Sequence, residues 1–291
     1  MQLHEMSKQT HDRLVGSGLD PNYVADIIRH TIAEDLDGGI DVTSVATVPL
    51  AQRSIATFGA RAHGCVAGLD IAAAAIEMVC GASASSFEYK KKDGDRVVPG
   101  DVLAQVEAPT QLMLTAERTA LNLLCHLSGV ATATAQWVDA IAGTTAIIRD
   151  TRKTTPGLRA LEKYAVRCGG GQNHRMSLSD AALVKDNHIV AAGGVAEAFE
   201  KVRALAATLP IEIEVDTLDQ LAVAIHAGAD LVLLDNMAPG VMAEAVLIAQ
   251  RHEAATGHAV LLEASGGLTL NNAKDVAATG VHFISVGGLT H

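Results

Sequence analysis

The segment IEIEVDTLDQLAVAIHAGADLVLLDN (residues 211–236) decides the fold class. Its two ends, 211–216 and 230–236, are short apolar runs typical of buried strands, and the residues between them have the apolar spacing of a helix. A strand, a helix and a second strand in this order form a right-handed crossover between two parallel strands. The segment therefore predicts an α/β protein.

Similar apolar runs occur on both sides of this segment. Each run ends in a charged or glycine-rich stretch, and helical stretches such as 195–209 separate them. The six runs cover 146–153, 181–188, 211–216, 230–236, 259–267 and 282–288. Six strand–helix units favour an α/β barrel that is incomplete or open on one side, with its site at the carboxyl ends of the strands.

The first part of the chain has a different pattern of predicted helices and strands. Residues 1–20 are polar and we expect them to fray, whereas apolar spacing predicts helices over 22–36 and 68–82. Strand-like runs lie between 54 and 108, and residues 110–143 read as two helices that meet near Ser128 and Gly129. This pattern of helices and strands predicts a separate α/β domain before the barrel.

The D-G-D-x-V-x-x-G-D pattern at 93–101 resembles the hammerhead of lipoyl and biotinyl carrier domains. A carrier domain needs an exposed lysine in a hairpin turn, but the comparable region here continues into the apolar stretch 107–124. We therefore interpret the pattern as structural.

Composition excludes several classes of function. The 291 residues carry 33 acidic against 22 basic side chains, a net charge of −11, which argues against binding to nucleic acid or an anionic membrane. The chain has no apolar leader at its start and no run near the about 18 apolar residues that span a bilayer. Its four scattered cysteines read as free thiols. We expect a cytoplasmic protein.

Basic residues are concentrated in one segment of this acidic chain. Residues 146–188 contain eight basic and four acidic side chains, so this segment is +4 inside a −11 chain. Arg149, Arg152, Lys153 and Arg159 fall within eleven residues. Arginine binds carboxylates and phosphates through two parallel hydrogen bonds, so this segment predicts a pocket for a small anion.

Acidic residues and glycine pairs follow the later strands. In IEIEVD the period of two places Glu212, Glu214 and Asp216 on one face, where carboxylates hold Mg²⁺ or sugar hydroxyls. The glycine pairs 266–267 and 287–288 expose backbone N–H groups suited to phosphate. Together these features predict a phosphorylated sugar that meets an acidic co-substrate.

Each feature alone has a simpler explanation. A glycine pair is more often a turn, Glu-x-Asp more often an ion-pair partner, and a lone histidine such as His174 more often a satisfied core or surface residue. His188 reads as a capping or supporting group, and Glu117 with Arg118 as a surface pair. Most of these residues lie at the ends of successive predicted strands, and this shared position favours a common binding site.

Several motifs resemble the quinolinate phosphoribosyltransferase family. They are EDLDGGIDVTS (34–44), ERTALNLLCHLSGVAT (117–132), RDTRKTTPGLR (149–159), CGGGQNHRMSLSDAALVKDNHI (168–189), EVDTLDQ (214–220), LLDNM (233–237), LEASGGLTLNN (262–272) and SVGGLTH (285–291). The resemblance runs from about residue 30 to the end of the chain, without a departure at a motif position.

The resemblance implies a pentosyltransferase of NAD biosynthesis, with nicotinate-nucleotide diphosphorylase (carboxylating) activity. Quinolinate and 5-phosphoribosyl-1-pyrophosphate would give nicotinate mononucleotide, pyrophosphate and CO₂, with Mg²⁺ as cofactor. It implies a hammerhead-like N-terminal α/β domain over 1–128 and an open-sided α/β barrel over 129–291, whose last residues are free to pack back on the first domain. A homodimer or dimer-based hexamer would share its active sites between subunits.

The resemblance also assigns site residues. Lys153, Lys185, Glu214 and Asp235 are the expected catalytic residues, and Glu214 and Asp235 would hold Mg²⁺ directly or indirectly. Arg118 of a neighbouring subunit would close the pocket, which replaces the surface-pair interpretation. The full expected substrate-binding set is Arg118, Thr151, Arg152, Lys153, His174, Arg175, Lys185, Glu214, Asp235, Ser265, Gly266, Gly267, Val286, Gly287 and Gly288.

Three alternatives stay open. A phosphoribosyltransferase-like protein associated with molybdenum transport shares the T-R-K-T and H-R elements, although KDNH (185–188) and GGGQNHR (169–175) favour the quinolinate enzymes. Nicotinate phosphoribosyltransferase handles a monocarboxylate and would need fewer cations. A non-enzymatic sugar-phosphate sensor would keep the glycine pairs but would not use both the acidic and the cationic strand ends.

Overall fold

The structure is a computed structural model that describes residues 2–290, and the chain forms two compact units. One unit contains the chain up to Ala133 together with Ala160–Gly169, and the other contains Thr134–Arg159 and the chain from Gly170 onward. The sequence interpretation divides the chain at 128 and assigns residues 129–133 and 160–169 to the barrel, so the two divisions differ for these two segments.

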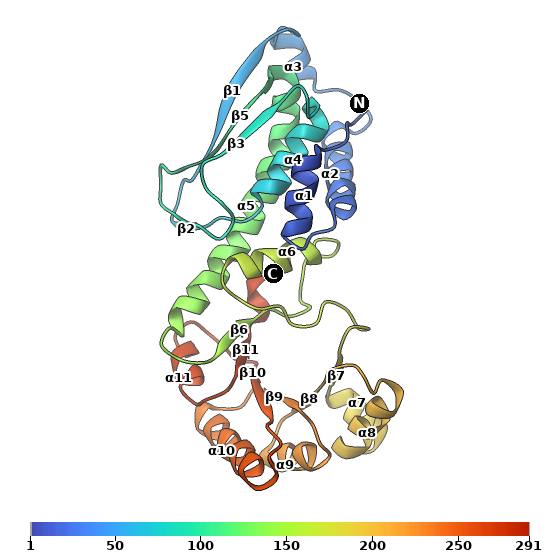
Figure 1. The fold of residues 1–291 in the computed structure, drawn as a ribbon, viewed down its shortest axis with the longest axis vertical. Coiled ribbons are helices and arrows are strands. Elements are labelled where there is room, and N and C mark those ends of the chain that lie inside the picture. Colours follow the sequence, from blue (N-terminus) through green and yellow to red (C-terminus); the bar gives the residue numbers. More distant parts are fainter. Residues whose placement is uncertain (1, 291) are drawn as a thin grey trace. The chain divides into compact units, whose positions relative to one another are not determined.

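The first unit is built on a three-stranded antiparallel sheet of order β1-β5-β3. Helix α4 packs on β5, and helices α1 and α2 pack on α4 (Figure 1). Its elements are α1 (Lys8–Gly16), α2 (Pro21–Leu36), α3 (Val42–Thr47), β1 (Arg53–Gly59), β2 (Gly64–Cys65), α4 (Leu69–Cys80), β3 (Ser86–Tyr89), β4 (Arg96–Val97), β5 (Val102–Pro109), the first part of α5 (Thr110–Ala140) and α6 (Arg159–Cys168).

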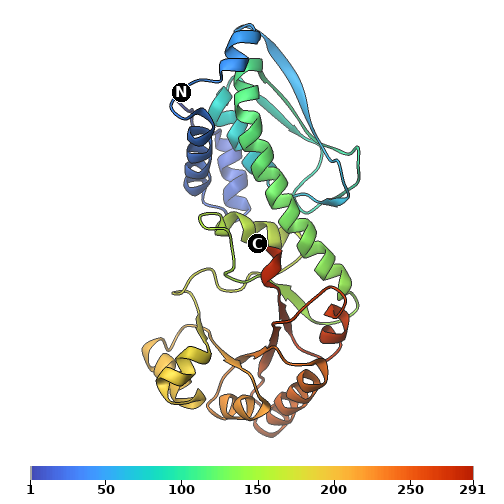
Figure 2. The same cartoon turned by 180° about the vertical axis from the view of Figure 1, so that it is seen from behind.

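Two expectations for this unit are wrong. Residues 8–16 form helix α1 instead of fraying, because Ser7 accepts a hydrogen bond from the Thr10 backbone N–H and Leu14 is fully buried. Residues 110–140 form one helix, which Figure 2 shows as a continuous green ribbon. Helix α5 continues through Ser128 because the Ser128 hydroxyl bonds to the backbone of Ala67 instead of capping a helix end.

The second unit is a six-stranded parallel sheet of order β6-β11-β10-β9-β8-β7. Strands β6 and β7 are consecutive in the chain but lie at opposite edges, so the barrel is open between them and the predicted fold class is confirmed. The elements are β6 (Ile147–Arg149), β7 (Ala182–Val184), α7 (Asp186–Ala192), α8 (Val195–Leu205), β8 (Ile211–Val215), α9 (Leu218–His226), β9 (Leu231–Asp235), α10 (Pro239–Thr256), β10 (Leu261–Ser265), α11 (Ala273–Ala277), β11 (Phe283–Ser285) and the 3₁₀-helix η1 (Gly287–Leu289).

Apolar strand residues fix the depth of each strand in this unit. Ile148, Ile213 and Val232 are at most 1% exposed, as are Leu262 and Ile284 on the later strands. Their burial aligns the strands, and the register pairs Ser265 with Asp235 and Ser285 with Arg149. The polar residues that follow therefore leave the sheet at one edge.

Two absences concern the described residues, 2–290. None of their helices combines the length and apolar character needed to cross a membrane. Their four cysteines are free, as the sequence predicts.

Candidate functional site

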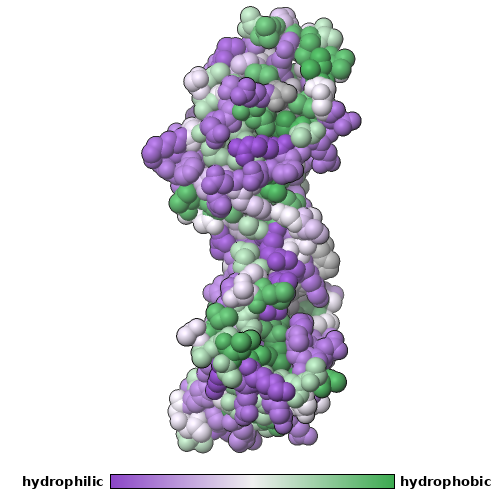
Figure 3. Space-filling model, turned by 90° about the vertical axis from the view of Figure 1, so that its right-hand side faces the viewer, coloured by the Kyte–Doolittle hydropathy of each residue, from purple (hydrophilic) through white to green (hydrophobic). Residues whose placement is uncertain are grey.

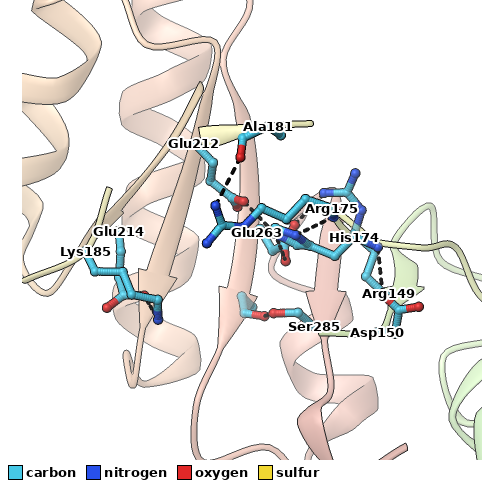
Figure 4. Close-up of polar contacts among 11 residues, drawn as sticks. Arg149, Asp150, His174, Arg175, Ala181, Lys185, Glu212, Glu214, Glu263 and Ser285 are labelled. Carbon is cyan, nitrogen blue, oxygen red and sulfur yellow. Dashed lines mark hydrogen bonds and ion pairs between the residues drawn. The ribbon is translucent and has the colours of Figure 1, made fainter. Parts of the chain in front are cut away.

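A cavity of about 960 Å³ opens at the carboxyl ends of the six parallel strands. Every residue that lines it belongs to the second unit. All the predicted site residues line this cavity except Arg118, which is an exposed residue of α5 in the first unit. The strand ends thus bring together residues separated by more than a hundred positions in the chain. Figure 4 shows the polar contacts of several of them.

One wall of the cavity is cationic. The Arg175 guanidinium donates a hydrogen bond from Nη1 to the carbonyl of Ala181 at 3.0 Å, which fixes its direction. Burial and the nearby charge of Arg152 lower the pKa of Arg175. The buried Nε of Arg152 has no hydrogen-bond partner among the described residues. Two neighbouring guanidinium groups without a bound carboxylate form a site for an anion.

Lys153 lies beside the last glycine pair. A β-carbon on Gly287 would come within 2.9 Å of Cδ of Lys153, so the lysine stem lies close against this glycine. Thr151 accepts a hydrogen bond from the Lys153 backbone N–H at 3.0 Å, and Thr290 donates one to its carbonyl at 2.7 Å. These bonds hold the backbone of Lys153 while its side chain stays exposed.

The opposite wall is acidic. Lys185 Nζ lies 3.1 Å from Oε2 of Glu214. Burial raises the pKa of Glu214, the nearby Asp235 and Asp186 raise it further, and Lys185 partly offsets them. Asp235 accepts a hydrogen bond from the Asn236 side chain at 2.9 Å. These contacts hold two carboxylates at one side of the cavity, where their mutual repulsion is only partly compensated.

A glycine turn completes the rim. Gly266 has φ +83°, and Asn236, which packs against it, has φ +52°. The Asn236 backbone N–H donates to the carbonyl of Ser265 at 2.9 Å. The chain therefore turns away from β10 with bare backbone at Gly266 and Gly267, which suits a phosphate group.

His174 is held from beneath the cavity. Its Nε2 lies 2.6 Å from Oε2 of Glu212, and its Nδ1 accepts a hydrogen bond from the Arg175 backbone N–H at 2.7 Å. The buried Asp150 accepts hydrogen bonds from the His174 backbone N–H and from the Asn173 side chain. Both ring nitrogens of His174 are thus engaged inside the protein (Figure 4).

The structure separates the three acidic residues that the period of two places together. Glu214 lines the cavity, Glu212 is 3% exposed beneath it, and Asp216 lies exposed beyond the end of β8. The predicted capping role of His188 is confirmed, because its Nδ1 accepts a hydrogen bond from the Lys185 backbone N–H at 2.9 Å.

Sequence reasoning missed several residues of this region. Trp137 and Asn236 line the cavity, and Glu263 lies fully buried beneath it. Glu263 had a signal, since a carboxylate inside the apolar run LLEAS is unusual for a buried strand. Asn236 had the signal that it directly follows a predicted strand, although it was not among the expected site residues. Trp137 had none, because only the tertiary fold brings it to the cavity.

Comparisons with known proteins agree with this geometry. The family model described as Quinolinate phosphoribosyl transferase, C-terminal domain, matches residues 130–291, and the corresponding N-terminal domain model matches 41–128. The chain is 49% identical over 266 residues to the nicotinate-nucleotide pyrophosphorylase [carboxylating] of Mycobacterium leprae, which covers 91% of this chain and 92% of that one. It is 41% identical over 267 residues to a probable enzyme of the same name from Bacillus subtilis, covering 91% and 88%.

A solved structure is similar over the same length. The nicotinate-nucleotide pyrophosphorylase of Francisella tularensis superposes with a TM-score of 0.86 at 38% identity, over 92% of each chain.

Proposed function

We propose, because the chain belongs to the quinolinate phosphoribosyltransferase family, that it transfers the phosphoribosyl group of 5-phosphoribosyl-1-pyrophosphate to quinolinate with loss of CO₂. The product would be nicotinate mononucleotide, so this chain would be a pentosyltransferase of NAD biosynthesis. The observation that supports this most strongly is a single cavity with a cationic wall, an acidic wall and glycine turns.

Quinolinate would bind at the cationic wall. It is a dianion, and bringing a dianion into a buried pocket beside a polyphosphate is costly unless cations are already in place. Arg152 and Arg175 provide two guanidinium groups there. We assign the recognition of its carboxylates to these two residues, with Arg118 of a second copy closing the pocket.

The phosphoribosyl donor would bind across the rest of the cavity. Lys153 would contact the pyrophosphate, and Glu214 and Asp235 would hold the ribose hydroxyls. The backbone at Ser265–Gly267 and at Val286–Gly288 would bind the 5-phosphate. Thr151 supports this arrangement because its hydroxyl holds the Lys153 backbone.

The acidic wall also fits a divalent cation. Burial and neighbouring carboxylates raise the pKa of Glu214, and a bound cation would offset that repulsion. Glu214 and Asp235 are the residues that would hold Mg²⁺, directly or indirectly. The chemistry that Mg²⁺ supplies when bound is stabilisation of negative charge on pyrophosphate.

The reaction would proceed in two stages. The ring nitrogen of quinolinate forms a bond to the anomeric carbon, and the bond from that carbon to pyrophosphate breaks with its electron pair on the leaving oxygen. The alkylated ring is an electron sink, so the 2-carboxylate leaves as CO₂ and its electron pair stays on the ring carbon, which then takes a proton. The chain's residues contribute orientation, charge compensation and that proton.

Lys185 is the proton donor that the contacts favour. Both ring nitrogens of His174 bond to Glu212 and to the Arg175 backbone. Lys185 contacts Glu214 at 3.1 Å, lines the cavity and has a side chain that is 48% exposed. We therefore assign the proton to Lys185.

The assembly and location belong to the same proposal. A homodimer, or a hexamer built from such dimers, would bring Arg118 of one subunit to the cavity of another. We place the enzyme in the cytoplasm, where free thiols such as those of its four cysteines stay reduced.

A direct assay tests the proposed function. Purified protein is incubated with 5-phosphoribosyl-1-pyrophosphate, Mg²⁺ and either quinolinate or nicotinate, and nicotinate mononucleotide is measured. We expect product from quinolinate only. Product from nicotinate alone would overturn the substrate, and no product from either with folded protein would favour the molybdenum-associated proteins or a non-enzymatic sensor.

A further inference from the structure

A buried charge cluster lies beneath the cavity and is not explained by substrate binding. It consists of Arg149 on β6, Glu212 on β8, Glu263 on β10 and His174 (Figure 4). Glu263 is 0% exposed and Glu212 is 3% exposed. Arg149 Nη1 lies 2.6 Å from Oε2 of Glu263, and its guanidinium stacks at 3.9 Å on the ring of Phe283.

Direct contacts leave this cluster with unequal charge. Arg149 is the one cation that contacts either buried carboxylate through a salt bridge among the described residues, apart from the ring of His174. His174 does not supply a second positive charge. Its Nδ1 accepts from the Arg175 backbone N–H, so the ring is neutral and carries its proton on Nε2, facing Glu212.

Two oxygens also lack partners. Oε1 of Glu212 and Oε1 of Glu263 are buried, and neither has a hydrogen-bond partner among the described residues. One ligand atom each of Glu212, Glu263 and His174 lies within 4.8 Å of the others. Burying carboxylate oxygens without hydrogen-bond partners costs free energy, so a metal ion or a proton must compensate them.

A metal ion in this cluster does not fit the contacts. The Arg149 guanidinium already lies against Glu263, and a divalent cation beside it would be repelled. The Nε2 of His174 carries a proton in the arrangement that its hydrogen bonds require, so it offers no lone pair. A single proton meets both needs, because it removes the excess negative charge and makes one oxygen a donor to the other.

We propose that Glu263 is a positioning residue that carries a proton in the working protein, and that its neutral carboxyl group bridges Arg149 and Glu212 to hold His174 and Arg175 in place. Oε2 would accept from Arg149, and the protonated Oε1 would donate to Glu212. Glu212 would accept both that hydrogen bond and the one from His174 Nε2–H. Burial and the nearby Glu212 charge raise the pKa of Glu263, in the direction this role needs.

The protonation state of Glu263 affects the anion pocket through the backbone of Arg175. His174 Nδ1 accepts from the N–H of Arg175, which is one of the two guanidinium residues of the cationic wall. If Glu263 lost its proton, the two facing carboxylates would repel each other, and a displaced Glu212 would no longer hold the His174 ring whose Nδ1 accepts from the Arg175 N–H. This part of the inference rests on the proposed function.

The charges that face Glu263 are those of the cluster and its nearest neighbours. Arg149 approaches from β6, Glu212 from β8 and His174 from the 170–181 loop. Strands β9 and β11 place the apolar Leu233 and Phe283 opposite Glu263 in register. The pH response of the cluster therefore depends on these groups and on Arg175, whose charge interacts with that of Glu212.

Infrared spectroscopy of the substrate-free protein tests the protonation state. We expect wild type at neutral pH to show the C=O stretch of a protonated carboxyl group that shifts in D₂O, and Glu263→Gln to lack this component. The control Glu244→Gln, at an exposed position of α10, should keep it. An identical spectrum for Glu263→Gln and wild type in this region would overturn the proposal.

Kinetics of two variants test the positioning role. Glutamine mimics the protonated carboxyl group, so Glu263→Gln should keep quinolinate KM and kcat within about threefold of wild type. Glu263→Ala should raise the quinolinate KM at least about tenfold while the protein remains folded by circular dichroism. If Glu263→Gln loses as much activity as Glu263→Ala, an ionised carboxylate is needed and the proposal is wrong.

The two readouts separate the inference from the proposed function. Without product from wild type, the assigned reaction fails, while the infrared component still decides the state of Glu263. If wild type forms nicotinate mononucleotide but its infrared spectrum lacks the Glu263 component, the proposed reaction is supported and the inference about Glu263 is wrong.

Discussion

A β-carbon at Gly266 would lie 2.3 Å from Oδ1 of Asn236 and 3.0 Å from its backbone nitrogen. Both residues have positive φ, and the Asn236 N–H bonds to the carbonyl of Ser265. The turn after β10 and the turn after β9 are thus packed together so closely that only glycine fits at 266. The same packing leaves bare backbone at the rim of the cavity.

Gly266→Ala should therefore damage both stability and donor binding. Backbone strain at φ +83° costs on the order of 1–2 kcal/mol, and the contact with Asn236 adds to it. We expect a lower melting temperature and a raised KM for 5-phosphoribosyl-1-pyrophosphate. Gly240→Ala is the matched control, because its β-carbon would meet nothing within 4 Å, and it should melt at or slightly above the wild-type temperature. Equal melting of both variants and wild type would contradict the packing argument.

Arg152→Ala should weaken quinolinate binding. Loss of one charge-assisted pair with a carboxylate costs roughly 1.5–3 kcal/mol, so the quinolinate KM should rise about 10- to 100-fold. Arg152→Lys keeps the charge but loses the two-pronged geometry, so it should recover only part of the loss. Arg251→Ala, at an exposed position of α10, is the control and should not change KM. An unchanged quinolinate KM in Arg152→Ala would remove this residue from the anion pocket.

Individual residues show how much of the site could be predicted from the sequence. The strand-end residues Lys153, Glu214 and Gly287 were predictable because parallel strands bring their carboxyl ends to one edge. The same rule places Asn236 after a strand, but its packing against Gly266 was not predictable, since it depends on the close approach of a neighbouring turn. Helix α5 was predicted as two helices that meet near Ser128 and Gly129, and only the fold shows that the Ser128 hydroxyl has a tertiary partner, the backbone of Ala67.

Glu263 predicts how stability depends on pH. Burial and the Glu212 charge raise its folded-state pKa above the unfolded value of about 4.3, so folding takes up a proton between these two pKa values. The stabilising contribution is complete below the unfolded pKa and is lost as pH rises through the folded pKa.

The free energy of unfolding of wild type should therefore fall relative to Glu263→Gln as pH rises from about 5 to 7.5. The slope from one group is at most about 1.4 kcal/mol per pH unit. Urea unfolding of both proteins at the two pH values measures it, with Glu244→Gln as the exposed control. Parallel curves for wild type and Glu263→Gln would show that the pKa of Glu263 is not raised.

Mixing two inactive variants tests the shared site. Arg118→Ala and Lys153→Ala should each lose activity, and heterodimers formed from them should regain part of it, because one of their two sites would contain both wild-type residues. Subunit exchange is verified by mass spectrometry of differently tagged chains, and Arg118→Ala mixed with itself is the control. No recovery after verified exchange would contradict a site built across two subunits.

The central claim is phosphoribosyl transfer coupled to decarboxylation, and carbon labelling tests it most directly. Quinolinate labelled in its 2-carboxyl carbon is incubated with the protein, 5-phosphoribosyl-1-pyrophosphate and Mg²⁺, and labelled CO₂, pyrophosphate and nicotinate mononucleotide are counted. The account predicts equal amounts of all three, with no label in the nucleotide. Label retained in a nucleotide product, or CO₂ released without pyrophosphate, would contradict it.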